Sequence, residues 1–312
     1  MAGDRLAAIS VDLDEVDCYT AIHGLPPLEG DAAHAIYRRA LPRLKALFEE
    51  LGVPATFFVI GRDATTDNAP TLRALHETGH ELANHSLNHR YDLSRRDPDT
   101  MRREVEGGAE RIARAAGVRP VGFRAPGYTI NDTLFDVLED LGVGYDSSVF
   151  PCPPYYAAKA AAIATYGARA RLGRGRESAS VLDHPRVLTA PADPYRRGRP
   201  FSNPGRGLRE LPIGVTRGLR LPYIGTSVVL AGERGADLLT RQIVGRPLVN
   251  LELHGIDLAD AELDGLVSLR PYQPDLRKSA AFKERSLRAA IGRLRASGYR
   301  FVTLAQAAEA LL

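Results

Sequence analysis

The stretch "FEELGVPATFFVI", residues 48–60, contains the pattern that decides the fold. Its first residues have the spacing of an amphipathic helix, Gly52 follows, and an apolar run begins at once. A glycine placed directly after a helix adopts the left-handed conformation without a Cβ clash. We therefore expect a helix that ends at Gly52 and a buried strand that starts directly after it.

The same order of helix, glycine and strand recurs along the chain. The other copies are "LHETGHELANH" (75–85), "ARAAGVRPVGFR" (113–124), "LEDLGVGYDSS" (138–148) and "LRASGYRFVTL" (294–304), with Gly79, Gly117, Gly142 and Gly298 after the helices. Helices that alternate with strands are typical of βα units and a parallel sheet. With "LAAISVDL" (6–13) and "PLVNLELH" (247–254) added, about seven strands result, enough to close a barrel.

We therefore predict an α/β fold, a barrel of βα units that forms one domain over residues 1–312. The best supported helices are 131–141, with Asn131 as a plausible N-cap, and 280–298. An open doubly wound sheet is the alternative, but no G-x-G-x-x-G motif follows a strand to support it.

The composition is that of an ordinary globular protein, with 44% hydrophobic and 25% charged residues. No apolar run approaches the ~20 residues of a transmembrane helix. The start, "MAGDRLAAISVDLDE", lacks the basic n-region of a signal peptide, and two cysteines make no disulfide framework. We expect a cytoplasmic protein with no nucleic-acid partner.

Residues 151–222 interrupt the repeating pattern. They contain ten prolines and twelve arginines and carry a net charge of +9, whereas the whole chain carries +3. We expect an insertion, at about 151–245, that forms a lid or specificity loop before the last catalytic motif. The alternative is a solvated, arginine-rich loop.

Polar and ionisable residues follow the predicted strands. They are Asp12, Asp14, His85, His89, Arg124, Asp146 and His254. In a βα barrel the C-terminal ends of the strands converge on one face, where active sites are built. The two histidines of "HSLNH" are four apart and can bind one metal ion, but Ser86 stands where a zinc protease carries its glutamate.

The order of these motifs resembles that of the polysaccharide deacetylase family (NodB-homology domain, carbohydrate esterase family 4). The matching motifs are "SVDLDE", "HSLNH", "RAPGY", "YDSSVF" and "LELH". The resemblance covers residues 6–146 and 248–306 and leaves the insertion uncovered. It implies a distorted (β/α)7 barrel and a hydrolase of carbon–nitrogen bonds other than peptide bonds, one that removes an N-acyl group from an amino sugar or glycoconjugate.

The resemblance also implies a role for each residue. Asp14, His85 and His89 would bind one divalent metal ion, zinc first, with cobalt, nickel or iron also suited to the donors. Asp12 would be the general base, and Arg124 would pair with it and hold it ionised. His254 would be the general acid, and Asp146 would orient its imidazole. The substrate would lie against Pro126, Gly127 and Tyr128, with a backbone N–H near Tyr128 facing the oxyanion.

Two departures from the family pattern narrow the range of expected substrates. Leu13 separates aspartates that are adjacent in the commonest first motif, which resembles a D-x-D branch with other substrates. The chain also has no tryptophan, the best platform for a sugar ring, so a polymer substrate is disfavoured, although Tyr128, Tyr155 and Tyr156 could stack on one sugar. An N-formyl sugar or a cyclic imide is the alternative substrate.

Two other classes explain fewer residues. A glycosyltransferase would use Asp12-Leu13-Asp14 as its D-x-D motif, but it leaves the histidines unexplained. A sugar-binding relic would have lost the base or a ligand, and none is missing.

The insertion begins after Asp146 and returns before His254, so both of its ends lie at the expected catalytic rim. Arginine is shaped for bidentate contact with phosphate. We therefore expect the insertion to cap the pocket and bind a phosphate of a lipid-linked or nucleotide-linked sugar.

Overall fold

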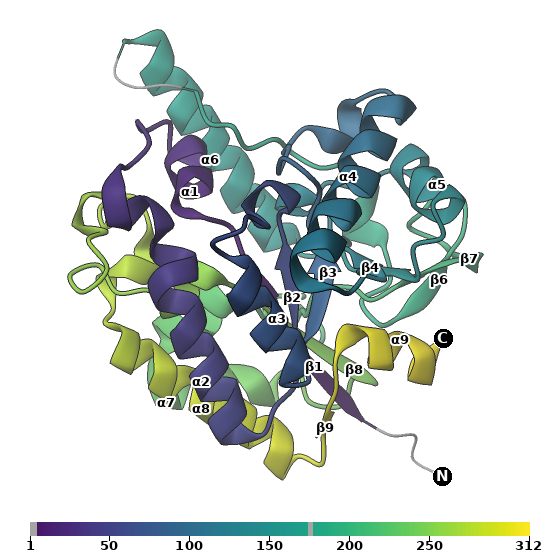
Figure 1. The fold of residues 1–312 in the computed structure, drawn as a ribbon. Helices are drawn as coiled ribbons and strands as arrows, with labels where there is room; N and C mark the ends of the chain where they lie inside the picture. The colour runs from purple at the N-terminus through teal and green to yellow at the C-terminus, as the bar shows by residue number, and fades with distance from the viewer. Residues whose placement is uncertain (1–4, 174–176) are drawn as a thin grey trace.

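The computed structural model describes residues 5–173 and 177–312, so Arg174 and Arg176 of the insertion lie outside the described residues. The centre of the molecule is a curved sheet with strands in the order β6-β7-β5-β4-β3-β2-β1-β8, and β9 pairs with β1 (Figure 1). The strands predicted from sequence are β1 Leu6–Asp12, β2 Ala55–Val59, β3 Glu81–Asn84, β4 Gly122–Phe123, β5 Tyr145–Asp146, β8 Leu248–His254 and β9 Arg300–Phe301. They are parallel to their neighbours, which confirms the βα barrel class.

Helices cover the outside of this sheet (Figure 1). They are α1 Val16–Ile22, α2 Leu41–Leu51, α3 Ala69–Glu77, α4 Pro98–Ala116, α5 Asp132–Asp140, α6 Pro153–Arg171, α7 Gly225–Arg241, α8 Ala280–Ala296 and α9 Leu304–Leu311. Gly52 follows α2 with φ 60° and ψ 45°, the left-handed conformation predicted for it. The Asn131 side chain accepts a hydrogen bond from the backbone N–H of Leu134, which confirms the predicted N-cap of α5.

The insertion contains two strands that the sequence pattern did not predict, β6 Tyr195–Arg197 and β7 Pro204–Glu210. β7 pairs in parallel with β5 and antiparallel with β6. Its sequence, "PGRGLRE", lacks the apolar run of a buried strand because its first residues are exposed. The insertion is therefore part of the sheet as well as a cover over it.

The irregular segment after β7 connects β5 and β8 through backbone hydrogen bonds. The Leu211 N–H donates to the Asp146 carbonyl on β5, and the Gly214 N–H donates to the Asn250 carbonyl on β8, both at 2.9 Å. This short, irregular closure accounts for the distortion of the barrel.

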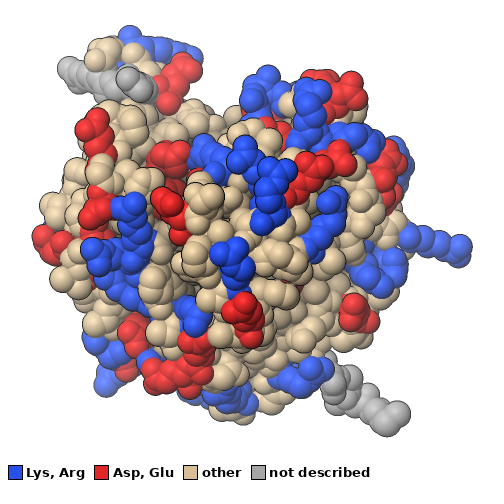
Figure 2. Space-filling view, viewed as in Figure 1, with Lys and Arg blue, Asp and Glu red and all other residues tan. Residues whose placement is uncertain are grey.

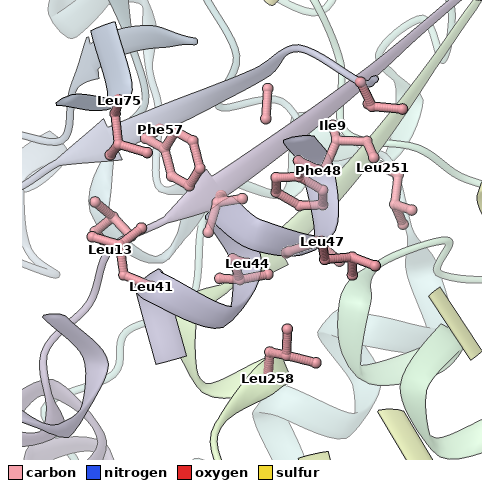
Figure 3. Close-up of a cluster of buried hydrophobic side chains, with 14 of the residues drawn as sticks. Ile9, Leu13, Leu41, Leu44, Leu47, Phe48, Phe57, Leu75, Leu251 and Leu258 are labelled. Carbon is pink, nitrogen blue, oxygen red and sulfur yellow. The ribbon is translucent and has the colours of Figure 1, made fainter. Parts of the chain in front are cut away.

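The two faces of β1 explain where the core ends and the site begins. Its outward residues Ile9 and Val11 lie in the main apolar cluster, where α2 packs against the sheet (Figure 3). Inward, the lower residues Leu6 and Ala8 join an apolar cluster with α9, which seals that end of the barrel. Toward the C-terminal end the inward face becomes polar, and it ends at Asp12.

The charges of the surface are mixed. In the view of Figure 2, basic and acidic side chains alternate over the visible face without forming one continuous basic area. None of the described helices has both the length and the apolar composition needed to cross a membrane.

Candidate active site

The C-terminal ends of β1, β3, β4 and β8 bring the predicted residues to one rim. Asp12 and His254 are direct neighbours in the pairing of β1 with β8. A cavity of about 160 Å³ opens at this rim, and its walls include Asp12, Asp14, His85 and His254. The predicted convergence on the C-terminal face of the barrel is therefore present.

Asp14, His85 and His89 face one another. One oxygen of Asp14 (Oδ1) lies 3.4 Å from Nε2 of His85 and 3.2 Å from Nε2 of His89. The histidines come from a tight loop rather than a helix, because Ser86 and His89 have positive φ angles of 65° and 54°. The Ser86 hydroxyl accepts the N–H of His89 at 3.0 Å and fixes this turn.

The hydrogen bonds of these three side chains leave their facing atoms free for a ligand. His85 uses Nδ1 to contact the carbonyl of Arg124 at 2.8 Å, which points Nε2 into the site. Asp14 Oδ1 and His89 Nε2 are buried, and neither has a hydrogen-bond partner among the described atoms. Buried polar atoms without partners are costly, so their shared direction fits a cation. Two imidazoles and one carboxylate are a donor set typical of a catalytic divalent metal, with positions left open.

The electrostatics of Asp14 and His89 agree with that assignment. For His85, burial alone would lower the pKa, but Asp12 and Asp14 raise it. Burial alone would raise the pKa of Asp14, but His89 and His85 lower it well below its usual value. Burial lowers the pKa of His89 despite the nearby Asp14. An ionised carboxylate and a neutral imidazole are the forms that bind a metal ion.

Asp12 is held by a different partner. Its Oδ1 accepts from Nη1 of Arg124 at 2.6 Å, and both side chains are buried. Arg124 also donates to the Ser147 carbonyl and to the Ser10 hydroxyl, both at 2.8 Å, so the guanidinium cannot rotate away. The predicted pair of Asp12 and Arg124 is thus present in the structure, and the other oxygen of Asp12 (Oδ2) lies 3.7 Å from Nε2 of His85.

The partner of His254 is Glu252, and the expectation that Asp146 orients this imidazole is wrong. Nδ1 of His254 lies 2.9 Å from Oε1 of Glu252, which is fully buried. Burial alone would lower the pKa of His254, but Glu252, followed by Asp14 and Asp12, raises it well above its usual value. The contact with Glu252 therefore favours the charged form of the His254 imidazole. Asp12, Glu252 and His254 also lie close enough to hold a cation together, but their ion pairs already account for them.

Asp146 belongs to a separate buried pair. It accepts hydrogen bonds from the N–H and the hydroxyl of Ser148, at 3.0 and 2.8 Å. Burial and the neighbouring Asp146 raise the pKa of Glu210 well above its usual value. Glu210 is on β7, and the insertion therefore supplies the group that engages Asp146.

The segment Pro126–Tyr128 forms one wall of the cavity. Gly127 and Tyr128 have positive φ angles of 60° and 63°, and a Cβ on Gly127 would lie 3.0 Å from the ring of Tyr91. The Tyr128 N–H donates to the Ala125 carbonyl at 2.9 Å, so it is not free to face an oxyanion as expected. The buried Tyr128 hydroxyl, in contrast, has no partner among the described atoms.

The arginines of the insertion that the structure describes do not line the cavity. None of the described arginines is among its lining residues. Arg197 instead pairs with Asp136 and Glu139 on α5, and Arg196 donates to the carbonyl of Leu312. The expected phosphate contact through the arginines of the insertion stays a prediction, and none of the described arginines supports it at the cavity. The basic group that the insertion places at the cavity is Lys159.

Sequence reasoning missed Glu252 and Lys159. Glu252 could have been found, because alternation along a strand puts residues two apart on one face, and Glu252 is two before His254. Lys159 lies in an alanine-rich helix without a catalytic motif, so no sequence pattern pointed to it.

Comparisons with known proteins match part of this chain to one family. Residues 31–145 match the family model described as polysaccharide deacetylase. The peptidoglycan deacetylase of Helicobacter pylori is 26% identical over 163 residues, which cover 50% of this chain and 54% of that protein. The peptidoglycan-N-acetylglucosamine deacetylase of Bacillus cereus is 30% identical over 101 residues, which cover 32% of this chain and 46% of that protein. The chain thus spans about half the length of these curated relatives.

Solved structures show the same fold over nearly the whole chain. A structure from Mycobacterium smegmatis, described as a polysaccharide deacetylase, has a TM-score of 0.60 and 22% identity, with 99% of this chain and 91% of that chain covered. A family 4 pseudoenzyme from Bacillus anthracis has a TM-score of 0.50 and 12% identity, with 99% of this chain and 66% of that chain covered. Because an inactive protein shares the fold, an argument for activity has to come from the residues of the site.

Proposed function

Because residues 31–145 match the family model described as polysaccharide deacetylase, we propose that the chain is a metal-dependent hydrolase. It removes an N-acyl group, first of all N-acetyl, from an amino sugar or glycoconjugate. The observation that carries this proposal is the division of the rim into three sets: an Asp14 group for a cation, Asp12 fixed by Arg124, and His254 fixed by Glu252. Amide hydrolysis needs a cation, a base and an acid placed in this way.

Asp14, His85 and His89 would hold one divalent ion, and we propose zinc because two imidazoles and a carboxylate suit it. When bound, this ion would polarise the amide carbonyl and make water easier to deprotonate. Cobalt, nickel and iron also bind to these donors. The donor set alone therefore does not select zinc, and the availability of each metal contributes to the choice.

Asp12 accepts the proton of the attacking water. Its second oxygen, Oδ2, lies 3.7 Å from Nε2 of His85 and so faces the cation-binding group, while Arg124 holds the first. The protonated His254 donates its proton to the nitrogen of the leaving amine, and Glu252 stabilises the charged imidazole before that step. The unpartnered Tyr128 hydroxyl offers a hydrogen bond to the substrate.

The small cavity favours a short acyl group, acetyl or formyl, next to these residues. The second candidate is therefore hydrolysis of an N-formyl sugar or of another non-peptide carbon–nitrogen bond, as in a cyclic imide. The same base, acid and cation would act in each case, because the walls of the pocket decide the size of the acyl group.

The test measures released amine, acetate and formate from N-acetylglucosamine, N-formylglucosamine and a cyclic imide, with zinc-loaded protein and with protein treated with a chelator. We expect acetate release from the N-acetyl sugar, loss of turnover on chelation, and recovery with Zn²⁺ or Co²⁺. Turnover of the imide alone would favour the second candidate. Undiminished turnover in protein shown by elemental analysis to contain no metal would refute the proposal.

A further inference from the structure

An apolar groove continues from the catalytic cavity along α6. It has a volume of about 360 Å³ and shares Ile22, Tyr155, Lys159 and Ser180 with the cavity. Every residue that lines this groove lies outside the range 31–145 that matches the family model. The groove is therefore an extension of the same opening, built by parts of this chain that the family match does not cover.

One face of α6 lines the groove without being buried against the body of the protein. Tyr155, Lys159 and Ile163 follow one another every fourth residue, and Ala162 and Tyr166 complete that face. A helix of this length ordinarily buries an apolar stripe, yet α6, which is described over all of its 19 residues, buries none of them. Figure 1 shows α6 at the edge of the molecule, beside α1.

The far end of the groove is held in place by hydrogen bonds. His23, which directly follows α1, contacts the Tyr166 hydroxyl through Nδ1 at 2.8 Å and Oε1 of Gln273 through Nε2 at 3.0 Å. Both imidazole nitrogens are thus already in use. The ring of Tyr272 lies 5.9 Å from that of His23 and extends the same wall. The groove is therefore preformed, and few of its polar atoms are free to bind hydroxyl groups.

Lys159 lies where the cavity and the groove meet. Its ammonium donates to the Gly127 carbonyl at 3.0 Å, beside the residues that line the catalytic cavity. Among the residues that the structure describes, no carboxylate lies within ion-pair distance of it, and Asp183 is the acidic side chain near enough to act on its charge. Burial lowers the pKa of Lys159 to about 8, so it keeps its charge at neutral pH. An unpaired, half-buried cation favours an anionic ligand.

We propose that Lys159 and the α6 groove form a subsite for an anionic group followed by a hydrocarbon chain on the substrate. The amide end lies in the catalytic cavity, the negative group contacts Lys159, and the chain lies against Ala162 and Ile163. A hydrocarbon fits better than a second sugar because the walls are apolar and both nitrogens of His23 are engaged. The identity of the reacting end rests on the proposed function, whereas the subsite rests on the groove itself.

The test compares matched derivatives of N-acetylglucosamine: a methyl phosphodiester, a decyl phosphodiester, a neutral decyl glycoside and the disaccharide diacetylchitobiose. We expect kcat/KM for the decyl phosphodiester to exceed that for the methyl phosphodiester by about tenfold or more, since each buried methylene adds to binding. Ala162→Phe should remove this preference, whereas Ala157→Phe, an exposed position on the opposite side of the same helix, should keep it. Lys159→Gln should remove the preference for the phosphodiester over the neutral glycoside.

Binding of decyl phosphate, measured by calorimetry with the same three variants, separates the subsite from the chemistry. Binding that depends on Lys159 and Ala162, without turnover of any sugar, would leave the subsite standing and refute the proposed function. Turnover of all sugars without any effect of the hydrocarbon chain or the charge would refute the subsite and leave the proposed function standing. The proposal would also be overturned if the second sugar of chitobiose raised kcat/KM by more than the decyl chain does.

Discussion

The replacement Glu252→Gln tests which carboxylate controls the general acid. In the structure, Glu252 Oε1 lies 2.9 Å from Nδ1 of His254, and the glutamate is fully buried. This carboxylate is the main reason that the pKa of His254 is raised despite burial, which alone would lower it. Glutamine keeps the size of the side chain and removes its charge.

The size of the effect follows from the contact. A hydrogen bond to a charged group contributes roughly 1.5–3 kcal/mol. Since about 1.4 kcal/mol corresponds to one pKa unit, the proton of His254 should be lost about one to two pH units earlier in the variant. A general acid acts only while protonated, so activity in Glu252→Gln should fall at a lower pH than in the wild type. The loss should be largest at alkaline pH and smallest below pH 6.

The assay is the pH dependence of kcat for release of the amine, measured from about pH 5 to 9.5 in the metal-loaded protein. We expect the alkaline limb of the profile to move to lower pH in Glu252→Gln, with unchanged metal content. Circular dichroism at each pH shows whether the variant remains folded over that range.

Asp146→Asn is the matched control, because the family resemblance assigns to Asp146 the role that the structure gives to Glu252. We expect the alkaline limb of Asp146→Asn to stay at the wild-type position even where kcat or stability falls. A shifted limb in Asp146→Asn together with an unshifted limb in Glu252→Gln would refute the reasoning.

Three other predictions concern the metal group, the base and the core. In Asp12→Asn, elemental analysis should show the metal retained, while kcat falls by ~10²-fold or more. Asp14→Asn should lose the metal itself. The opposite pattern of metal contents would mean that the two roles are exchanged. Arg124→Met leaves Asp12 buried without its cation, so urea unfolding should show a loss of ~3–5 kcal/mol, and an unchanged midpoint would contradict this. Leu44→Ala, in the apolar cluster of Figure 3, should cost ~2–5 kcal/mol of stability without changing KM.

The sheet of βα units could be predicted because its signals are local. In each of the five predicted helix–glycine–strand units, the helix ends at a glycine with positive φ or just before one, as at Gly52 and Gly117, and a strand follows within a few residues. The alternation of β1 sends Asp12 inward, and the parallel pairing then brings it beside His254. These steps use periods of two and 3.6 residues, which a sequence shows directly.

The contribution of the insertion could not be predicted in the same way. β7 joins the sheet through backbone hydrogen bonds to β5, and backbone pairing leaves no mark on a sequence such as "PGRGLRE". The position of α6 over the cavity depends on contacts of His23 with Tyr166, which are far apart in the chain. Such contacts are decided by tertiary packing, not by propensity.

The insertion also explains why His254 has a different partner from the one that the resemblance implied. The segment after β7 binds the backbone of both β5 and β8, through Leu211 and Gly214, so it occupies the space between Asp146 and the strand of His254. Glu210, at the end of β7, lies close enough to Asp146 for the two carboxyl groups to influence each other, and its pKa is raised by burial and by Asp146. With Asp146 engaged there, the imidazole needs a carboxylate from another source, and alternation along β8 supplies Glu252 on the same face. The pairing of β7 with β5 and the contact of Glu252 with His254 are therefore connected: the first engages Asp146, and the second supplies the carboxylate that His254 needs.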